Sequence, residues 1–199
     1  MEPAPQQPLL FSEAQMRGFV LPPQQPPWQM DQPALQRWKA AIAQAQQQVR
    51  TEQVLRQGTL FDSINPRVEA ADIDPFTLEL HNFFFFQWPS DRSAQDACIY
   101  FVLDSTVSLI LYIGETCRTH RRWQGDHDCK RYVLNYQSLH FQHQMPTAIN
   151  TVFWWDAPAA PRPRQQLEAS LIRRWKSPFN QENWETWGTP FVSPEITPP

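Results

Sequence analysis

Short apolar runs in the second half of the chain predict a small β-sheet. Residues 98–103 (CIYFVL) and 109–113 (LILYI) are rich in β-branched and aromatic side chains, and Asp104 between them is a turn former. A third run at 149–155 (INTVFWW) has the same character. We therefore expect three mostly antiparallel strands, with the second near 108–114.

Helical spacing of apolar residues predicts helices around this sheet. Residues 34–57 carry an incomplete apolar stripe among Gln and Ala, and Pro33 is acceptable in a first turn. This helix either packs on the main domain or forms an oligomerisation or DNA-spanning surface. Further helices are expected at 115–123, 132–144 and 164–176. The predicted class is α/β, a small three-stranded mainly antiparallel sheet flanked by helices, with a helical and irregular N-terminal extension.

Composition divides the chain into four segments. Residues 1–33 are rich in Pro and Gln and predict a disordered arm. Residues 34–97 hold the first helix and an aromatic connecting segment, 98–184 the main domain, and 185–199 a short tail. The four consecutive phenylalanines at 83–86 cannot all face water, so they cover the sheet, form a dimer contact or stack on bases.

Charge and cysteine content limit the choice of cellular compartment and of binding partners. The net charge of −3 argues against a general nucleic-acid coat, yet residues 98–184 hold ten basic and seven acidic side chains. Three cysteines give no disulfide framework and fit a reducing cytosol. No apolar stretch approaches the roughly 18 residues that span a bilayer. We expect a cytoplasmic protein with no membrane partner.

Each strand of the predicted hairpin carries one tyrosine. The period of two along a strand can aim Tyr100 and Tyr112 at one spot, and Gly114 follows where backbone can approach a neighbour closely. Two phenols beside a glycine would make a polar site on an apolar hairpin. A single strand tyrosine is more often a half-buried packing residue, so the hairpin alone leaves both interpretations open.

A basic segment follows the hairpin. Arginine suits fork-like contact with phosphate oxygens, although each of these side chains taken alone is more often simply solvated. The basic residues that could face phosphates are Arg118, Arg121, Arg122, Lys130 and Arg131.

The same segment admits a structural zinc site. The four candidate ligands are Cys117, His120, His127 and Cys129, although a His-x-Cys pair is an uncommon spacing. His140 and His143 lie further on, in the helix expected at 132–144, and are expected to be surface polar residues rather than ligands.

Glu168 lies beside the apolar stripe of the last predicted helix. A carboxylate there is costly unless it is exposed or has a partner such as a metal ion. At helical spacing it can also form a surface ion pair with Arg164 or Arg173. Spacing alone leaves these two interpretations open.

The order of these residues resembles the GIY-YIG endonuclease family over residues 98–183. The first triplet reads CIY, with Cys98 where the family has glycine, and the second reads YIG. Arg122 lies ten residues past Tyr112, as the family arginine does, whereas the family histidine position holds Asp126 and His127 follows one place later. The run LEASLIRRWKSPFN aligns Glu168 with the metal-binding glutamate of the family and Asn180 with its closing asparagine.

The resemblance implies a metal-dependent endonuclease that hydrolyses phosphodiester bonds in nucleic acid, DNA in preference to RNA. Glu168 would hold one Mg²⁺ or Mn²⁺ ion. The other implied catalytic residues are Tyr100, Tyr112, Arg122 and His127. Substrate contacts would involve Gly114, Arg118, Arg121, Lys130 and Asn180, the last by holding the local structure.

The sequence leaves open the oligomeric state and two alternatives to an endonuclease. A single active site cuts one strand at a time, so double-strand cleavage would need a homodimer or two binding events. The chain could instead be a catalytically silent nucleic-acid-binding or assembly module on the same fold. A zinc-stabilised scaffold is the third reading.

Overall fold

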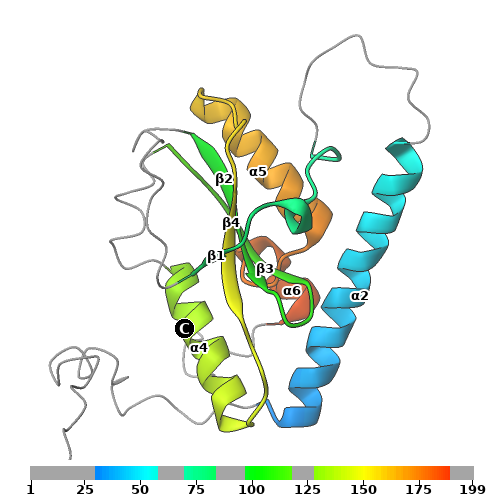
Figure 1. Cartoon of the computed structure of the whole chain (residues 1–199), viewed down its shortest axis with the longest axis vertical. Helices are drawn as coiled ribbons and strands as arrows, with labels where there is room; N and C mark the ends of the chain where they lie inside the picture. The colour runs from blue at the N-terminus through cyan, green and yellow to red at the C-terminus, as the bar shows by residue number, and fades with distance from the viewer. Residues whose placement is uncertain (1–29, 58–69, 84–96, 118–127, 189–199) are drawn as a thin grey trace, which may run out of the picture.

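The computed structural model forms an α/β unit around one antiparallel sheet (Figure 1). It describes residues 30–57, 70–83, 97–117 and 128–188. The arm at 1–29, most of the phenylalanine run and most of the basic segment after the hairpin therefore lie outside the described residues. None of the described helices is both long and apolar enough to cross a membrane.

The sheet has the strand order β1-β4-β2-β3, with every neighbouring pair antiparallel. Its strands are β1 (His81–Asn82), β2 (Cys98–Asp104), β3 (Leu109–Thr116) and β4 (Ile149–Trp154). The three predicted strands are confirmed. The two-residue strand β1 was not predicted, because so short a segment shows no alternation.

The described helices surround this sheet. They are α2 (Gln32–Gln57), α4 (Asp128–Gln142), α5 (Pro161–Trp175) and the single turn α6 (Trp184–Trp187), with 3₁₀ turns η1 (Pro75–Thr77) and η2 (Gln181–Asn183). The helix expected at 115–123 was wrong at its start, since β3 runs on to Thr116. The expected start at 164 was also wrong, because α5 takes Pro161 and Pro163 into its first turn, where a missing N–H costs no bond.

Apolar side chains fill both faces of the sheet. All seven residues of β2 are buried, as expected for a central strand whose first six residues form an apolar run. One face, called here the α2/α4 face, packs against those two helices. The opposite face, called the α5 face, packs against Leu167, Leu171, Ile172 and Trp175.

Helix α2 is part of this packed unit. Its core side chains are Leu35, Trp38 and Ile42, which share a cluster with the α2/α4 face of β2. The amide of Gln46 bonds the backbone of Ile110 on β3 in both directions, at 2.8 and 2.9 Å. Of the two interpretations offered for this helix, packing on the main domain is therefore confirmed.

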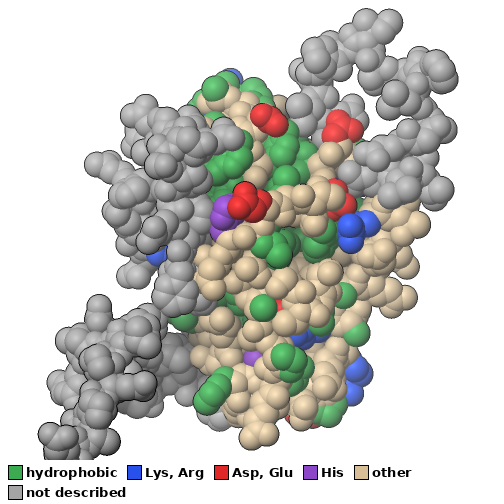
Figure 2. All heavy atoms as spheres, in the orientation of Figure 1, with side chains coloured by type: hydrophobic (Ala, Val, Ile, Leu, Met, Phe, Trp, Pro, Cys, Tyr) green, Lys and Arg blue, Asp and Glu red, His purple; other side chains and the backbone are tan. Residues whose placement is uncertain are grey.

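Lys and Arg side chains are few and scattered on the face of the molecule shown in Figure 2. The basic cluster predicted from the sequence, at 118–122, lies outside the described residues.

Candidate active site

β3 contains a β-bulge directly before its tyrosine. The pairing register passes from Leu103 opposite Ile110 to Val102 opposite Tyr112, which leaves Leu111 as the extra residue. Because side chains alternate with a period of two, one inserted residue moves everything after it to the other face of the sheet. The orientation of the YIG segment is thus set by Leu111.

The bulge brings the two tyrosines to the same face. If the register of the hairpin end simply continued, Tyr112 would oppose Phe101, which faces the α5 core. Instead Tyr112 packs against the α2/α4 core, where Tyr100 is buried. The two ring centroids lie 6.0 Å apart with the planes tilted by 33°. The expectation that these side chains meet is confirmed.

Gly114 lies directly opposite Tyr100 on the neighbouring strand. A Cβ added at Gly114 would overlap the Tyr100 phenol and would lie 2.7 Å from its Cε1 atom. The backbone of Gly114 does not need a glycine for its own conformation, since among the described glycines only Gly188 has a positive φ. The group that approaches Gly114 so closely is therefore the Tyr100 ring, which is 3% exposed.

Asn180 fixes the middle of the YIG segment. Its Oδ1 accepts from the Ile113 N–H, and its Nδ2 donates to the Ile113 carbonyl, both at 2.9 Å. Ser177 Oγ donates to the same Oδ1 at 2.6 Å and thereby orients the amide. Asn180 is 5% exposed, so it acts on the strand from within the protein, as the expected role in holding local structure requires.

Glu168 reaches the end of the same strand. One carboxylate oxygen, Oε1, accepts the backbone N–H of Glu115 at 3.0 Å. Helical spacing left open a surface ion pair of Glu168 with Arg164 or Arg173; in the structure Arg164 pairs with Glu115 and Arg173 donates to Ser170. The carboxylate that the sequence singles out therefore lies one residue past the YIG triplet.

A carboxylate at this place suits a hard divalent cation. Mg²⁺ is usually held by one or two carboxylates together with waters and substrate phosphates, so a single protein ligand is adequate. The described residues contain no group of three or more His, Cys, Asp or Glu side chains able to enclose an ion. The Glu168 carboxylate has the oxygen donors that such a cation prefers.

The remaining predicted site residues are only partly described. Lys130 is half-buried in the first turn of α4. Among the suggested zinc ligands, Cys117 is exposed and Cys129 is buried in the core. The other positions lie outside the described residues: Arg118, His120, Arg121, Arg122 and His127.

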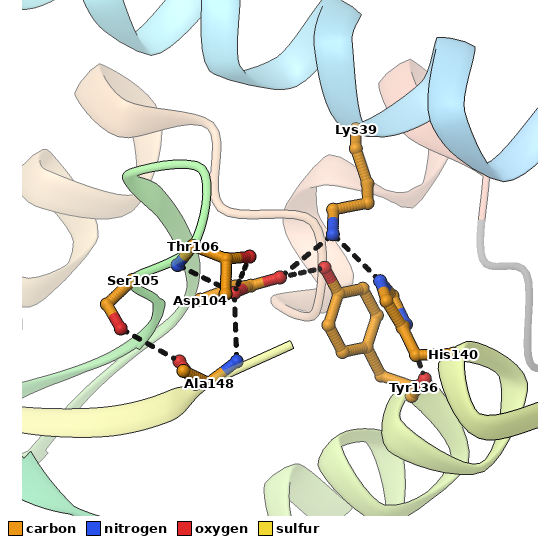
Figure 3. A network of polar contacts seen from close by, with 7 residues as sticks. All are labelled: Lys39, Asp104, Ser105, Thr106, Tyr136, His140 and Ala148. Atoms are coloured by element: carbon orange, nitrogen blue, oxygen red, sulfur yellow. Dashed lines mark hydrogen bonds and ion pairs between the residues drawn. The ribbon is translucent and has the colours of Figure 1, made fainter. Parts of the chain in front are cut away.

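A second polar cluster, which sequence reasoning missed, joins α2, β2 and α4 beneath the hairpin turn (Figure 3). Lys39 Nζ lies 3.0 Å from Asp104 Oδ2 and 2.8 Å from His140 Nε2. Tyr136 donates its hydroxyl to the same Asp104 oxygen at 2.7 Å. His140 is fully buried, so its expected place on the surface was wrong.

The protonation states in this cluster follow from its bonds. His140 Nδ1 faces the Tyr136 carbonyl at 2.7 Å and must donate to it, so Nε2 accepts from the Lys39 ammonium. Burial lowers the pKa of His140, which keeps the ring neutral. Burial would raise the pKa of Asp104, but hydrogen bonds from Thr106 and Tyr136 and the charge of Lys39 hold it below its usual value.

This cluster has a structural role, because it links α2, β2 and α4. Asp104 Oδ1 accepts from the N–H of Thr106 at 3.1 Å and from its hydroxyl at 2.6 Å, so both carboxylate oxygens are bonded. A cavity of about 430 Å³ lies next to Lys39, between α2 and the segment around Met145. Asp104 already balances the charge of Lys39, so Lys39 gives this cavity no net positive charge that would attract an anion.

No protein-family model, no curated protein and no solved structure matches this chain.

Proposed function

We propose that this protein is a metal-dependent endonuclease of the GIY-YIG type, which hydrolyses phosphodiester bonds in nucleic acid, with DNA as the preferred substrate. One observation supports this above the others. Residues from three separate parts of the sequence converge on the short segment 112–115. Tyr100 covers Gly114, Asn180 bonds Ile113, and Glu168 accepts the N–H of Glu115.

That convergence is more specific than any of its parts. A tyrosine pair in a hairpin, a buried asparagine and a helix glutamate each have ordinary structural explanations. Their meeting on segment 112–115 is what the motif order of the resemblance would require. The bulge at Leu111 and the Glu168 contact support the proposal further, since neither can be read from motif spacing.

In the proposed reaction a water oxygen forms a bond to phosphorus, and the bond from phosphorus to one ester oxygen breaks. The water gives up a proton, and the departing oxygen takes one. Glu168 would hold Mg²⁺ or Mn²⁺ through carboxylate oxygen. Such an ion would supply positive charge that offsets the phosphate charge and lowers the pKa of nearby water.

The other side chains position the reactants. Tyr100 orients the attacking water, and because an isolated phenol titrates near pH 10 it needs a neighbouring base, for which His127 is the candidate. Tyr112 positions the scissile phosphate, and Arg122 offsets its developing charge. Asn180 acts through Ile113 and holds the segment on which Tyr112 and Gly114 lie.

The low exposure of Tyr100 also fits an alternative function, that of a catalytically silent nucleic-acid-binding module. A phenol that is 3% exposed and packed on Gly114 is also what a packing residue would look like, as in a catalytically silent nucleic-acid-binding module on the same fold. The two proposals differ in what the hydroxyl does. Metal-dependent nicking separates them from each other, and metal analysis of the purified protein tests the zinc-stabilised scaffold.

The central experiment compares wild type with Glu168→Gln on plasmid DNA, branched DNA and RNA, each with Mg²⁺ or Mn²⁺. Glu168→Gln keeps the side-chain size and removes the charge, so cleavage should be lost while DNA binding in a mobility-shift assay remains. The matched control is Glu182→Gln, an exposed glutamate on η2. Wild-type cleavage by Glu168→Gln would refute the proposal, and binding without cleavage by the wild type would favour the silent module.

Removal of single hydroxyls tests the tyrosines. Tyr100→Phe and Tyr112→Phe should lower turnover by about 10²-fold, the usual scale for a positioned proton-transfer group, with little change in melting temperature. Tyr132→Phe, in the aromatic cluster with Phe179 and Trp184, is the matched control. Full nuclease activity in the double variant of Tyr100 and Tyr112 would assign both residues to packing.

A further inference from the structure

Glu115 connects the proposed metal ligand to a buried arginine. Its backbone N–H donates to Glu168 Oε1 at 3.0 Å, and its own carboxylate forms an ion pair with Arg164. The carboxylate of Glu115 is 16% exposed and the side chain of Arg164 only 2%. The side chains of two glutamates, Glu115 of β3 and Glu168 of α5, thus lie at the end of β3, and Arg164 pairs with Glu115.

Arg164 joins three parts of the chain at that point. Besides Glu115 at the end of β3, its guanidinium donates to the carbonyls of Pro158 and Ala159, at 2.9 and 2.7 Å. These carbonyls belong to the loop before α5, and Arg164 itself lies in the first turns of that helix. Glu168 follows one helical turn later, on the same side of the helix.

A buried guanidinium that meets a carboxylate and two carbonyls in a fixed fork leaves little freedom to the groups it holds. This contact ties the end of β3 to the start of α5. Glu168 spans that same gap from the helix side, because it lies on α5 and bonds the backbone of β3. The position of the Glu168 carboxylate therefore depends on the pair of Arg164 and Glu115.

We infer that Arg164 is a positioning residue for the metal-binding carboxylate, acting through Glu115. This inference rests on the proposed function, since it concerns how the chain presents Glu168 to a divalent cation. Arg164 does two things in it. It fixes the strand end whose N–H orients Glu168, and it balances the charge of the Glu115 carboxylate.

The test uses a double variant that keeps the net charge. Glu115→Gln with Arg164→Met removes one negative and one positive charge, so a change in metal affinity reports orientation rather than overall charge. Arg173→Met with Glu182→Gln is the matched control, because both residues are exposed and the same charges are lost. Arg164→Lys keeps the ion pair but not the fork, and it remains informative if the double variant is poorly folded.

The first readout is Mn²⁺ binding without nucleic acid, followed by electron paramagnetic resonance well below the melting temperature. The second is plasmid nicking, with turnover separated from the Mn²⁺ concentration that gives half the maximal rate. Loss of a residue that orients a metal ligand typically costs 10–100-fold, so Mn²⁺ affinity and turnover should each fall by about tenfold or more. Arg164→Lys should lie between this variant and the wild type, and the control pair should match the wild type.

Wild-type Mn²⁺ affinity in a folded double variant would overturn the inference, whatever happens to its activity. Equal losses in the control pair would overturn it as well, since the effect would then come from charge removal in general. Glu168→Gln separates this failure from failure of the proposed function. If Glu168→Gln binds Mn²⁺ and cleaves as the wild type does, the metal site itself is wrong; if only the Arg164 variants are normal, the positioning role alone is wrong.

Discussion

Replacement of Gly114 by alanine gives the sharpest test of the geometry at the candidate site. The added methyl would overlap the Tyr100 phenol, which is 3% exposed and has no room to withdraw. Overpacking of this kind costs about 1–3 kcal/mol. For a chain of 199 residues each kcal/mol lowers the melting temperature by about 2–4 °C, so we expect a loss of about 2–12 °C together with most of the nuclease activity.

The effect of Gly114→Ala on the free energy of unfolding should change sign when the Tyr100 ring is absent. Tyr100→Ala alone costs about 3–5 kcal/mol, but it removes the group that the methyl would strike. In that background Gly114→Ala should be neutral or should stabilise by about 0.4–1 kcal/mol, because alanine has fewer unfolded conformations and Gly114 is not at positive φ. Urea unfolding of the four proteins of this double-mutant cycle gives the coupling directly.

Gly188 supplies the control for this cycle. It has φ 63° and open space around its Cα, so Gly188→Ala should cost about 1–3 kcal/mol of backbone strain in either background. Additive behaviour of Gly114→Ala with Tyr100→Ala would refute the reasoning, since the steric contact between ring and glycine would then not exist in solution.

Two further predictions concern stability. Burial lowers the pKa of His140 from its ordinary 6.5, so the unfolded chain takes up the proton first, and the free energy of unfolding should decline as the pH falls through and below about 6.5. Urea titrations at several pH values should show this slope in the wild type and a smaller one in His140→Gln; equal slopes would contradict it. Asn180→Leu leaves the N–H and carbonyl of Ile113 without their side-chain partners and should lower the free energy of unfolding by about 2–6 kcal/mol. Gln46→Leu should cost about the same, because it does the same to Ile110. Only Asn180→Leu should also lower DNA nicking per folded molecule. Equal activity losses in the two would assign Asn180 to stability alone.

The sheet could be predicted because its signal is local. Each of the three longer strands is a short run of β-branched and aromatic residues, and β2 is buried throughout, so its sequence has no polar interruption before Asp104. Helix starts were predicted less well. Prolines at the start of α5 look like a loop in sequence, although a helix accepts them in its first turn.

The candidate site was predictable only as a set of residues. Motif order singles out Tyr100, Tyr112, Glu168 and Asn180, but it does not say that Leu111 is an extra residue in β3, because a bulge has no sequence signal of its own. The pairing of Glu168 illustrates the same limit. Helical spacing offered Arg164 and Arg173 as possible partners, whereas in the structure Arg164 pairs with Glu115 on the adjacent strand.

The cluster around Asp104 was missed for a related reason. Lys39, Asp104, Tyr136 and His140 are separated by up to about a hundred residues, and each is polar enough to be expected at the surface. Burial of such a group is tolerable only when all its partners are buried with it. A pattern interpreted one segment at a time therefore cannot show that these side chains meet, and it assigned His140 to the surface.

The outer edge of β3 bears on how two copies of this chain could act together. An edge strand with unsatisfied N–H and carbonyl groups invites pairing with a second sheet. Here Gln46 and Asn180 bond both backbone groups of Ile110 and Ile113 as a neighbouring strand would. Phe179 N–H donates to the Leu111 carbonyl at 2.9 Å, and Glu168 accepts from Glu115. Because these contacts also hold the candidate site, strand addition at β3 would dismantle it, so a homodimer that cuts both strands must form through another surface.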